Sequence, residues 1–261
     1  ETIQKGTSFG LAALFLDAKA RGVQQILVSL GGSGTSDGGV GLLKGLGAAV
    51  DSLAQVDDID FSQLQSFKGV DVIGMADVTN PYAGPKGFAQ FFGKQKGGIA
   101  EILQQQDDQA WKVVEILKRK YDIDVQVVPG TGAAGGLGGA LVCLGGRIES
   151  GFDTIARLIH IEEAIAQADL VITGEGQMDY QTENGKVPFG LARLAQKYGV
   201  DTIALCGALG EHLGKMDEIL LSSFSIQQSA LSLSEAMDTD RTLKNIERLA
   251  RMVTKTYFKS S

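Results

Sequence analysis

Clusters of glycine that follow short apolar runs are the feature that most constrains how this chain can fold. Its 261 residues include 35 glycines but only 4 prolines, and many of the glycines are grouped. Two such groups are Gly31–Gly39, after the apolar run 25–30, and Gly130–Gly139, after the apolar run 125–128. Short apolar runs predict buried strands, and the periodic segments between them predict helices. Alternating strands and helices predict an α/β fold with a mainly parallel sheet.

The pattern along the chain places the individual elements. We expect strands near residues 25–30, 70–76, 125–128, 169–173, 202–206 and 222–226. We expect helices near residues 8–21, 98–120, 134–145, 151–167 and 234–258, and a helical stretch from residue 39 to about 50. The first helix should be capped by Thr7 or Ser8, end at Gly22, and present Phe9, Ala12, Ala13 and Leu16 as its apolar face. Ligands of parallel sheets bind beyond the carboxyl ends of the strands, where the glycine groups fall.

Charge and cysteine content exclude several classes of protein. The formal net charge is −7, which disfavours binding to nucleic acid or to an anionic membrane. Cys143 and Cys206 lie in apolar runs and are too few for a disulfide framework, so we expect buried free thiols. No run of 18 apolar residues occurs. We therefore expect a cytoplasmic protein with small-molecule ligands, and we leave a homodimer open.

The Gly31–Gly39 loop has the composition of an anion-binding loop. Glycine lets backbone N–H groups turn toward a ligand, and the N-terminus of the following helix favours phosphate or carboxylate. The residues that we expect to bind are Gly32, Ser33, Gly34, Thr35 and Asp37. The alternative is a tight turn in which one of the polar side chains caps the helix. We place anion binding first, because one capping residue would suffice for a turn and this loop has several.

Asp77 and Asn80 follow the predicted strand 70–76. A carboxylate and an amide at a strand end can orient a polyhydroxy acid or hold a metal. They can equally form a turn, since the Asn80-Pro81 pair is typical of one, and the two interpretations stay open.

The segment Gly130–Gly135 matches the glycine spacing of a dinucleotide-binding loop, and Glu149 follows at about the expected distance. In that interpretation the acid ends a second strand. A strand at Glu149 is hard to place between Gly145-Gly146 and Gly151, so we doubt the dinucleotide site. Close packing of a helix against glycine is an equally good explanation.

The Gly174–Lys186 loop carries the groups that phosphoryl transfer needs. It offers two carboxylates, Glu175 and Asp179, and the cation Lys186. A carboxylate can accept the proton of an attacking hydroxyl or hold a metal, and a cation can neutralise developing phosphate charge. A solvated loop also carries such residues, so composition favours the functional interpretation only slightly.

Four segments, taken together, resemble the glycerate kinase family of bacterial class I, also called the glycerate 2-kinase type. The segments are Leu30–Gly39, Ala76–Gly87, Pro129–Gly138, and Thr173–Thr182 with Gly185–Pro188. They occur in the family's order and span most of the chain. Ser36 stands where the family usually has Asn, and Tyr180 where a small polar residue is common. Neither departure removes a charge.

The resemblance implies a fold and a reaction. The fold would be two α/β domains, one flavodoxin-like with a parallel sheet and one inserted. Residues 1–150 would form the inserted domain, and residues 151–261 the C-terminal half of the flavodoxin-like domain. The family's first strand is absent, so the resemblance implies an N-terminally incomplete chain. The implied substrates are ATP and D-glycerate with Mg²⁺, and the implied product is 2-phosphoglycerate.

The resemblance to the family suggests a role in the reaction for several loop residues. Asp179 would orient or deprotonate the attacking hydroxyl, Lys186 would neutralise the transferring phosphoryl group, and Glu175 would hold Mg²⁺. Further substrate or phosphate contacts would come from Gly174, Gly176, Gln181 and Thr182, together with the residues of the 31–37 and 77–80 loops. Two alternatives stay open: an NAD(P)-dependent oxidoreductase that uses Gly130–Gly135, and an inactive fragment.

Overall fold

A computed structural model describes residues 2–183 and 185–260 of the chain. The chain divides into two units, Glu1–Gly151 and Phe152–Ser261, and each unit combines helices with a three-stranded parallel sheet. The predicted α/β class with parallel sheets is therefore confirmed. The identification of 1–150 with an inserted domain, and of 151–261 with half of a flavodoxin-like domain, stays a prediction.

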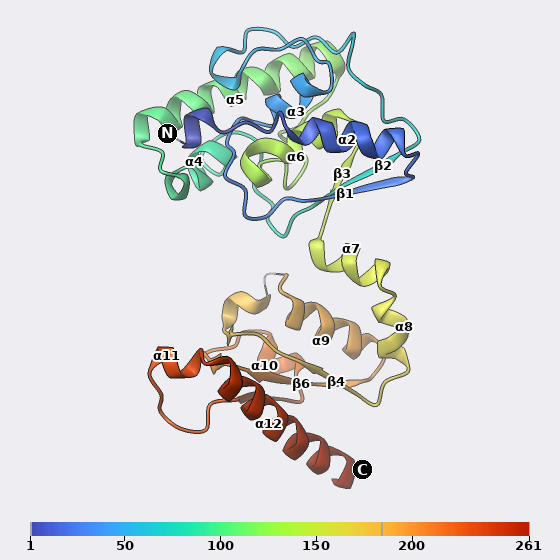
Figure 1. Cartoon of the computed structure of the whole chain (residues 1–261), viewed down its shortest axis with the longest axis vertical. Helices are drawn as coiled ribbons and strands as arrows, with labels where there is room; N and C mark the ends of the chain where they lie inside the picture. The colour runs from blue at the N-terminus through green and yellow to red at the C-terminus, as the bar shows by residue number, and fades with distance from the viewer. Residues whose placement is uncertain (1, 184, 261) are drawn as a thin grey trace. The chain divides into compact units, whose positions relative to one another are not determined.

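The first unit is built around the sheet β1-β2-β3 (Figure 1). Its elements are α1 (Thr2–Lys5), α2 (Leu11–Ala20), β1 (Gln25–Ser29), α3 (Val40–Gly45), η1 (Leu53–Gln55), β2 (Asp71–Met75), α4 (Phe88–Phe92), η2 (Lys94–Lys96), α5 (Ala100–Tyr121), α6 (Ala133–Cys143) and β3 (Arg147–Glu149). β2 is the central strand, and its middle residues Val72, Ile73 and Gly74 are all buried. Both faces of this strand are therefore covered, as is usual in parallel sheets.

The edge strand β1 differs from the expected buried strand. It pairs with β2 in parallel register, with Ile26 beside Val72 and Leu27 beside Ile73. Its own residues are only half-buried or exposed, because it has a neighbour on one side and lies at the margin of the core. The apolar run correctly predicted a strand but not its exposure.

The second unit is built around the sheet β4-β6-β8. Its elements are α7 (Gly151–Leu158), α8 (Ile161–Ala166), β4 (Leu170–Thr173), β5 (Gln177–Met178), η3 (Tyr180–Glu183), α9 (Val187–Lys197), β6 (Asp201–Cys206), β7 (Ala208–Leu209), α10 (Met216–Ile219), β8 (Ser222–Ser225), α11 (Leu233–Ala236) and α12 (Thr239–Ser260). β5 and β7 form a separate parallel pair beyond the ends of β4 and β6.

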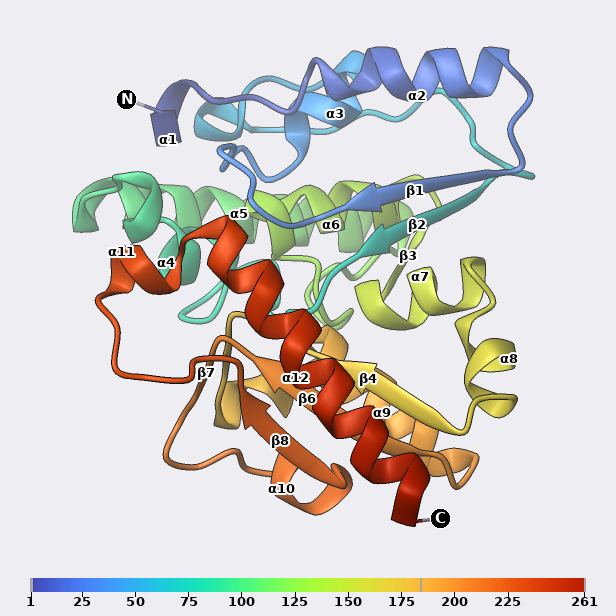
Figure 2. The ribbon, with the colours of Figure 1, turned by 60° about the horizontal axis from the view of Figure 1, so that its bottom comes forward.

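The two faces of this second sheet pack against different helices (Figure 2). Successive side chains of a strand point to opposite faces. Leu170 accordingly packs in a cluster with Val253 of α12, whereas its neighbour Val171 packs in a cluster with Ala195 of α9. The unit is therefore a three-layer arrangement of helix, parallel sheet and helix.

Several predicted elements are confirmed. The strands at 70–76, 169–173 and 202–206 and the helix at 98–120 are present within one or two residues of the expected bounds. α2 ends where Gly22 adopts φ +69°, the left-handed conformation that ends many helices. Pro188 lies in the first turn of α9, where its missing N–H is tolerated.

Other predictions are wrong, both for short strands and for the bounds of two long helices. Residues 125–128 form turns rather than a strand, and Val127 is exposed. Arg147–Glu149 forms β3, so the strand that was hard to place at Glu149 does exist. The expected helix 151–167 is broken at His160, which adopts φ +52° between α7 and α8. The expected helix 234–258 is likewise divided into α11 and α12.

The apolar face of α2 is a further correction. Ala12 and Phe15 are its buried residues, whereas Phe9, Ala13 and Leu16 are exposed. Neither Thr7 nor Ser8 caps the helix through its side chain: Gly10 is the N-cap residue, and the backbone oxygen of Ser8 accepts a bond from Leu11 N. The hydroxyl of Ser8 is directed instead to Asp37.

Both cysteines are free thiols, as expected. Cys206 is fully buried, whereas Cys143 is partly buried, and desolvation raises the pKa of the Cys143 thiol to about 12.

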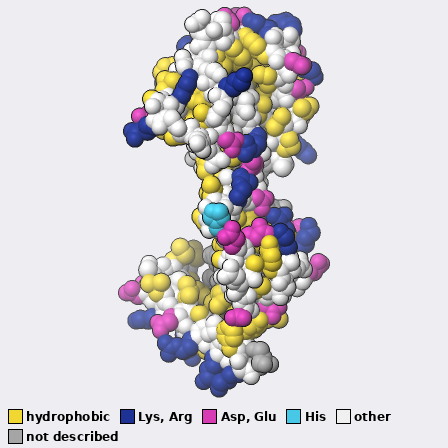
Figure 3. Space-filling view, turned by 90° about the vertical axis from the view of Figure 1, so that its right-hand side faces the viewer, with side chains coloured by type: hydrophobic (Ala, Val, Ile, Leu, Met, Phe, Trp, Pro, Cys, Tyr) yellow, Lys and Arg dark blue, Asp and Glu magenta, His cyan; other side chains and the backbone are white. Residues whose placement is uncertain are grey.

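Of the helices described here, none is long and apolar enough to cross a membrane. Figure 3 shows Lys and Arg side chains interspersed with Asp and Glu on the face that it presents, without a continuous basic field.

The packing of α6 predicts which glycine is essential for the fold of the first unit. Gly135 and Gly145 both have positive φ, +67° and +81°. A Cβ at Gly135 would overlap the carbonyl oxygen of Thr35, whereas a Cβ at Gly145 would meet no atom within 4 Å. Gly145→Ala should lower the free energy of unfolding by ~1–2 kcal/mol through backbone strain alone, and Gly135→Ala by ~2–5 kcal/mol because overlap adds to strain.

Trp111, the single tryptophan of the chain, lies on α5 and reports on the first unit. Urea unfolding followed by its fluorescence measures both variants. Equal losses for Gly135→Ala and Gly145→Ala would contradict the packing argument.

Candidate active site

Three loops of the first unit meet at the carboxyl ends of β1 and β2. Gly38 N donates to Gly135 O at 2.9 Å, and Gly132 N donates to Asn80 O at 3.1 Å. The segments 31–39, 77–80 and 130–136 are thus joined by backbone bonds. Parallel strands explain this convergence, because their carboxyl ends meet at one edge of the sheet.

The glycines of these loops fall into two groups with different surroundings. At Gly38, Gly39, Gly135 and Gly136 a Cβ would approach an atom of another segment to less than 3.0 Å, a backbone atom at Gly135 and Gly136 and a side-chain atom at the other two. At Gly31, Gly32 and Gly34 a Cβ would meet nothing within 4 Å. The first group is explained by packing, whereas the second leaves the start of the Gly31–Gly39 loop open to a ligand.

Asp37 holds this loop to the N-terminal segment of the unit. Its carboxylate accepts bonds from the backbone N–H groups of Ser8 (2.7 Å), Gly39 (3.0 Å) and Gly41 (3.2 Å). The hydroxyls of Ser8 and Thr7 donate to it as well, at 2.9 and 3.2 Å. With five donors around it, the carboxylate has a structural role in the fold, and direct contact between Asp37 and a substrate stays a prediction.

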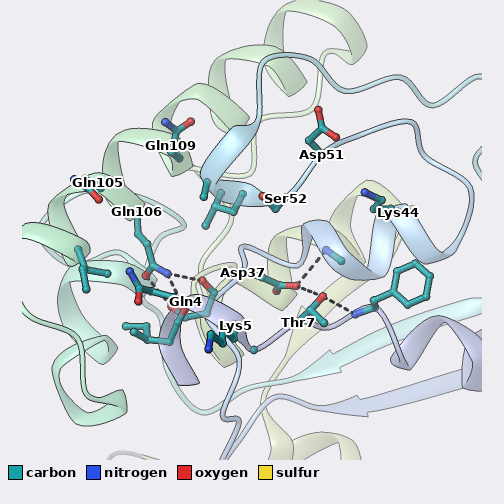
Figure 4. A pocket seen from close by; sticks show the side chains of 18 residues that line it. Gln4, Lys5, Thr7, Asp37, Lys44, Asp51, Ser52, Gln105, Gln106 and Gln109 are labelled. Atoms are coloured by element: carbon teal, nitrogen blue, oxygen red, sulfur yellow. Dashed lines mark hydrogen bonds between the residues drawn. The ribbon is translucent and has the colours of Figure 1, made fainter. Parts of the chain in front are cut away.

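A cavity of about 580 Å³ lies beside Asp37 (Figure 4). Its polar wall includes Lys5, Lys44, Asp51 and Gln105, and its apolar wall includes Ile3, Phe9 and Leu53. Figure 4 shows the side chains of α5 on one side of this cavity and Asp37 with Thr7 on the other. The charged groups of both signs at its wall do not select one class of ligand.

Asp77 and Asn80 both take part in loop contacts. The Asn80 side-chain amide donates to Lys86 O at 2.8 Å and closes the loop of residues 80–86. Asp77 is exposed and accepts a bond from Gly151 N at 2.9 Å. The turn expected at Asn80-Pro81 is not there: residues 78–81 form neither turn nor bend, and the turn of this segment is closed by the bond from Gly87 N to Gly84 O. A ligand contact by Asp77 or Asn80 stays a prediction.

Lys96 is the residue of this region that sequence reasoning missed. It ends η2, and its Nζ donates to Thr35 O at 2.5 Å and to Ser33 Oγ at 3.3 Å. Burial lowers the pKa of Lys96, and the charge of Asp37 partly opposes that shift. About sixty residues separate Lys96 from the loop that it contacts, so no local pattern could have linked them.

In the second unit the 174–186 loop is ordered around Thr182. This fully buried residue donates its hydroxyl to Glu175 Oε1 at 2.6 Å and accepts a bond from Asp179 N at 3.2 Å. The other carboxylate oxygen of Glu175 lies 3.3 Å from Lys186 Nζ. The loop therefore joins Glu175 to Thr182 and Lys186 through side chains and holds Asp179 to Thr182 through its backbone, and a shared site for these residues stays a prediction. Asn184 lies outside the described residues.

Strand pairing and close packing fix the start of this loop. Gly207 N donates to Glu175 O, and Ala208 N to Gly176 O, at 3.0 and 2.9 Å. A Cβ at Gly174 would overlap Leu205 O, whereas Gly176 has open space around it. Gly174 is therefore needed for packing. Of these two glycines, Gly176 is the one that a ligand can approach.

Asp179, which is half-buried, and Gln181 are linked by a bond within this loop. Asp179 Oδ1 accepts a bond from Gln181 N at 2.9 Å, and none of the described residues bonds to Oδ2. Gln181 is exposed, and so is Tyr180, at 60%. A carboxylate with one oxygen fixed and the other available can accept a proton or a cation.

The oxygen donors of this loop fit Mg²⁺ only in part. Within the described residues no three His, Cys, Asp or Glu side chains lie close enough to hold a metal. Mg²⁺ is usually held by one or two carboxylates, with water and substrate phosphates completing its shell. Glu175 and Asp179 are of the right type for such a partial site. Lys186 occupies one oxygen of Glu175, so that carboxylate is available only after Lys186 moves.

The dinucleotide interpretation of Gly130–Gly135 loses its structural context. The doubt about it rested on the absence of a strand at Glu149, and that reason was wrong because β3 ends there. The motif nevertheless fails at its other end, since no strand precedes the loop: residues 125–128 form turns. Ala134, Gly135 and Gly136 also have positive φ, so no regular helix N-terminus faces a ligand.

Comparison with known proteins identifies related chains. The sequence model of the glycerate kinase family matches residues 1–258. The chain is 38% identical to glycerate 2-kinase of Escherichia coli (strain K12), over 88% of this chain and 64% of the relative. It is 33% identical to glycerate kinase of Halalkalibacterium halodurans, over 95% of this chain and 68% of the relative. The chain thus spans about two thirds of the length of these curated relatives.

A solved structure agrees with these sequence relatives. A crystal structure assigned to glycerate kinase 2 of Salmonella typhimurium LT2 matches with a TM-score of 0.82 and 33% identity. The match covers 97% of this chain and 70% of that chain.

The hydrogen bonds of Asp37 predict a loss of stability when its charge is removed. Asp37→Asn would replace one carboxylate oxygen by an NH2 group, which would face either Gly39 N or, in the flipped orientation, Ser8 N and Gly41 N. Unfolding of the first unit, followed by Trp111 fluorescence, should require ~2–4 kcal/mol less free energy. Asp51→Asn is the matched control, because Asp51 is an exposed residue of the same cavity, and we expect a change within ~0.5 kcal/mol. Similar effects of the two substitutions would contradict the structural role of Asp37.

Proposed function

The chain belongs to the glycerate kinase family, which confirms the resemblance of its four loop segments, and we propose that the protein transfers the γ-phosphoryl group of ATP to D-glycerate. The proposed product is 2-phosphoglycerate. One observation carries the proposal: within the 174–186 loop, buried Thr182 bonds to the Glu175 carboxylate and to the Asp179 backbone, and Lys186 pairs with Glu175. The names of the relatives supply the acid substrate, and this group of side chains supports the phosphoryl transfer.

Asp179 is the proposed proton acceptor. Gln181 N holds one of its oxygens, which fixes the orientation of the carboxylate. The other oxygen would accept a bond from the attacking hydroxyl of glycerate and take its proton as the oxygen–phosphorus bond forms. Gln181 and Thr182 would keep this carboxylate in place, and Gly176 would let a substrate approach the backbone.

Lys186 is the proposed cation for the transferring phosphoryl group. Its side chain is 44% exposed, and its ammonium pairs with Glu175 at 3.3 Å. A phosphate that approaches would compete with Glu175 for the ammonium, because it carries more negative charge than a carboxylate. Mg²⁺, when bound, would neutralise phosphate charge further, and Glu175 would be its ligand, directly or through water.

The loops of the first unit are proposed to bind the anionic ends of the substrates. Gly32, Ser33, Gly34 and Thr35 would bind a phosphate or the glycerate carboxylate, and Asp77 with Asn80 would contact hydroxyls or metal. The open space around Gly32 and Gly34 supports the first of these assignments. Asp37 would act on the substrate indirectly, since it holds the loop in shape.

The reaction is tested by ADP release from ATP and Mg²⁺ in the presence of D-glycerate. The position of the phosphate follows from NMR, because phosphorus couples to the carbon-2 proton only in 2-phosphoglycerate. Turnover that requires NAD(P) rather than ATP would favour the oxidoreductase. Activity only in a longer chain that contains these residues would favour the inactive-fragment alternative for the 261-residue chain.

The proposed proton acceptor predicts a specific kinetic defect. Asp179→Asn should lower kcat by ~100-fold or more, because general base catalysis contributes ~10²–10⁴-fold, with a smaller change in KM for ATP. Asp217→Asn is the matched control in the same unit, since Asp217 is an exposed residue of α10, and it should keep kcat within about twofold. If Asp179→Asn keeps kcat within a few-fold while the fold is intact, Asp179 is not the base.

A further inference from the structure

Lys96 is held in place by the backbone around it. The turn Gly93–Gly98 is closed by the bonds Lys96 N to Gly93 O (3.1 Å) and Gly98 N to Gly93 O (3.0 Å). Gly97 has φ +85°, and a Cβ at Gly98 would crowd Leu103 and Ile3. The turn is thus tightly packed, and it directs Lys96 to the Gly31–Gly39 loop without needing a ligand.

The charge of Lys96 is unusual because the side chain is half-buried and yet forms no ion pair among the described residues. Several lysines of the chain form ion pairs, for example Lys120 with Asp58 and Lys197 with Glu162. Lys96 is half-buried, yet within the described part of the chain no carboxylate lies within 4.0 Å of its Nζ. Its partners are one hydroxyl and one carbonyl oxygen, which solvate an ammonium but do not neutralise it. A partly desolvated cation of this kind is stabilised by an anion.

The space next to Lys96 is suited to an anion. The loop residues that it contacts, Ser33 and Thr35, alternate with Gly32 and Gly34, whose Cβ positions face open space. Gly32 also has φ +64°, a conformation that exposes backbone N–H groups in many anion-binding loops. The Lys96 ammonium therefore lies beside a short loop segment that offers a hydroxyl and accessible backbone.

We propose that Lys96 is the cation of an oxyanion-binding subsite formed with Gly31–Thr35. The ligand is an oxyanion: the carboxylate of the acid substrate or a phosphoryl group of the nucleotide. An oxyanion satisfies the ammonium and the backbone donors at once, whereas a neutral hydroxyl leaves the charge unpaired. The assignment deepens the proposed function, because it names a binding residue for that reaction, but the binding itself does not require the reaction.

The binding experiment is an NMR titration of the full chain with inorganic phosphate, D-glycerate, ATP and glycerol in separate arms. We expect at least one of the three anions to shift the backbone amide resonances of Gly31, Gly32 and Gly34, and glycerol to leave them unchanged. A response to D-glycerate alone identifies a carboxylate subsite, and a response to ATP and phosphate identifies a phosphoryl subsite. No shift at these amides with any anion, or shifts that map only elsewhere, overturns the proposal in the wild-type protein.

Substitution of the lysine tests the charge itself. Lys96→Gln keeps a hydrogen-bond donor but removes the charge, and it should raise the Kd of the responding anion at least tenfold. Lys96→Arg should recover part of the loss. Lys94→Gln is the matched control, since Lys94 begins the same η2 turn and is exposed, and its Kd should stay within twofold of wild type. An unchanged Kd in Lys96→Gln, or an equal loss in Lys94→Gln, overturns the proposal.

The outcomes separate this inference from the proposed function. If ADP release occurs but Lys96→Gln leaves Kd and KM unchanged, the kinase proposal stands and the subsite does not. If no ADP is released but anion binding depends on Lys96, the subsite stands and the kinase proposal does not. Circular dichroism and Trp111 fluorescence verify the fold of each variant. The wild-type titration decides the matter if Lys96→Gln fails to fold.

Discussion

The close approach of two backbone segments, Thr35–Gly38 and Ala134–Gly136, is the constraint on which the binding loops of the first unit depend. The bond from Gly38 N to Gly135 O joins them, and there is no space for a side chain at Gly135. This contact brings the end of the loop after β1 against the start of α6, and α6 in turn packs on β2 and β3. The strands, the helix and the loop are therefore positioned together, and the shape of the loop follows from backbone packing rather than from a ligand.

The high glycine content thus has two physical causes that composition cannot distinguish. Gly38, Gly39 and Gly135 are glycines because another chain segment occupies the place of a side chain. Gly31 and Gly34 border open space, and packing gives no reason to exclude a side chain there. Close approach of a ligand to the backbone supplies such a reason. The apparent dinucleotide motif belongs to the first group, which explains why its spacing was misleading.

The sequence predicted local structure well where the signal extended over several residues. The 22-residue helix α5 and the buried strands β2 and β6 have long or strongly apolar patterns, and all three are present. Val125–Val128 was misassigned because three valines and one glutamine are too short a pattern to distinguish a strand from a turn. β3 was missed because glycines flank it, although pairing with β2 stabilises it.

The candidate sites show the same limit at the level of side chains. Glu175, Asp179 and Lys186 are close in sequence, so their grouping could be predicted from one loop. The partnership of Lys96 with Ser33, and of Asp37 with Ser8, joins residues that are 63 and 29 positions apart. Such pairs depend on the tertiary fold, and a single sequence carries no record of them.

The two charged residues at the Gly31–Gly39 loop, Asp37 and Lys96, have different roles: Asp37 stabilises the fold, and Lys96 serves the proposed binding. Asp37 is surrounded by donors from the chain itself, so its negative charge is satisfied when the unit folds. Lys96 contacts a different part of the loop and forms no ion pair among the described residues, although the charge of Asp37 acts on it at longer range. If both charges had served stability, a direct ion pair between them would have been the simpler arrangement. Their separation leaves one positive charge available beside open backbone, which is the property that an anion-binding loop requires.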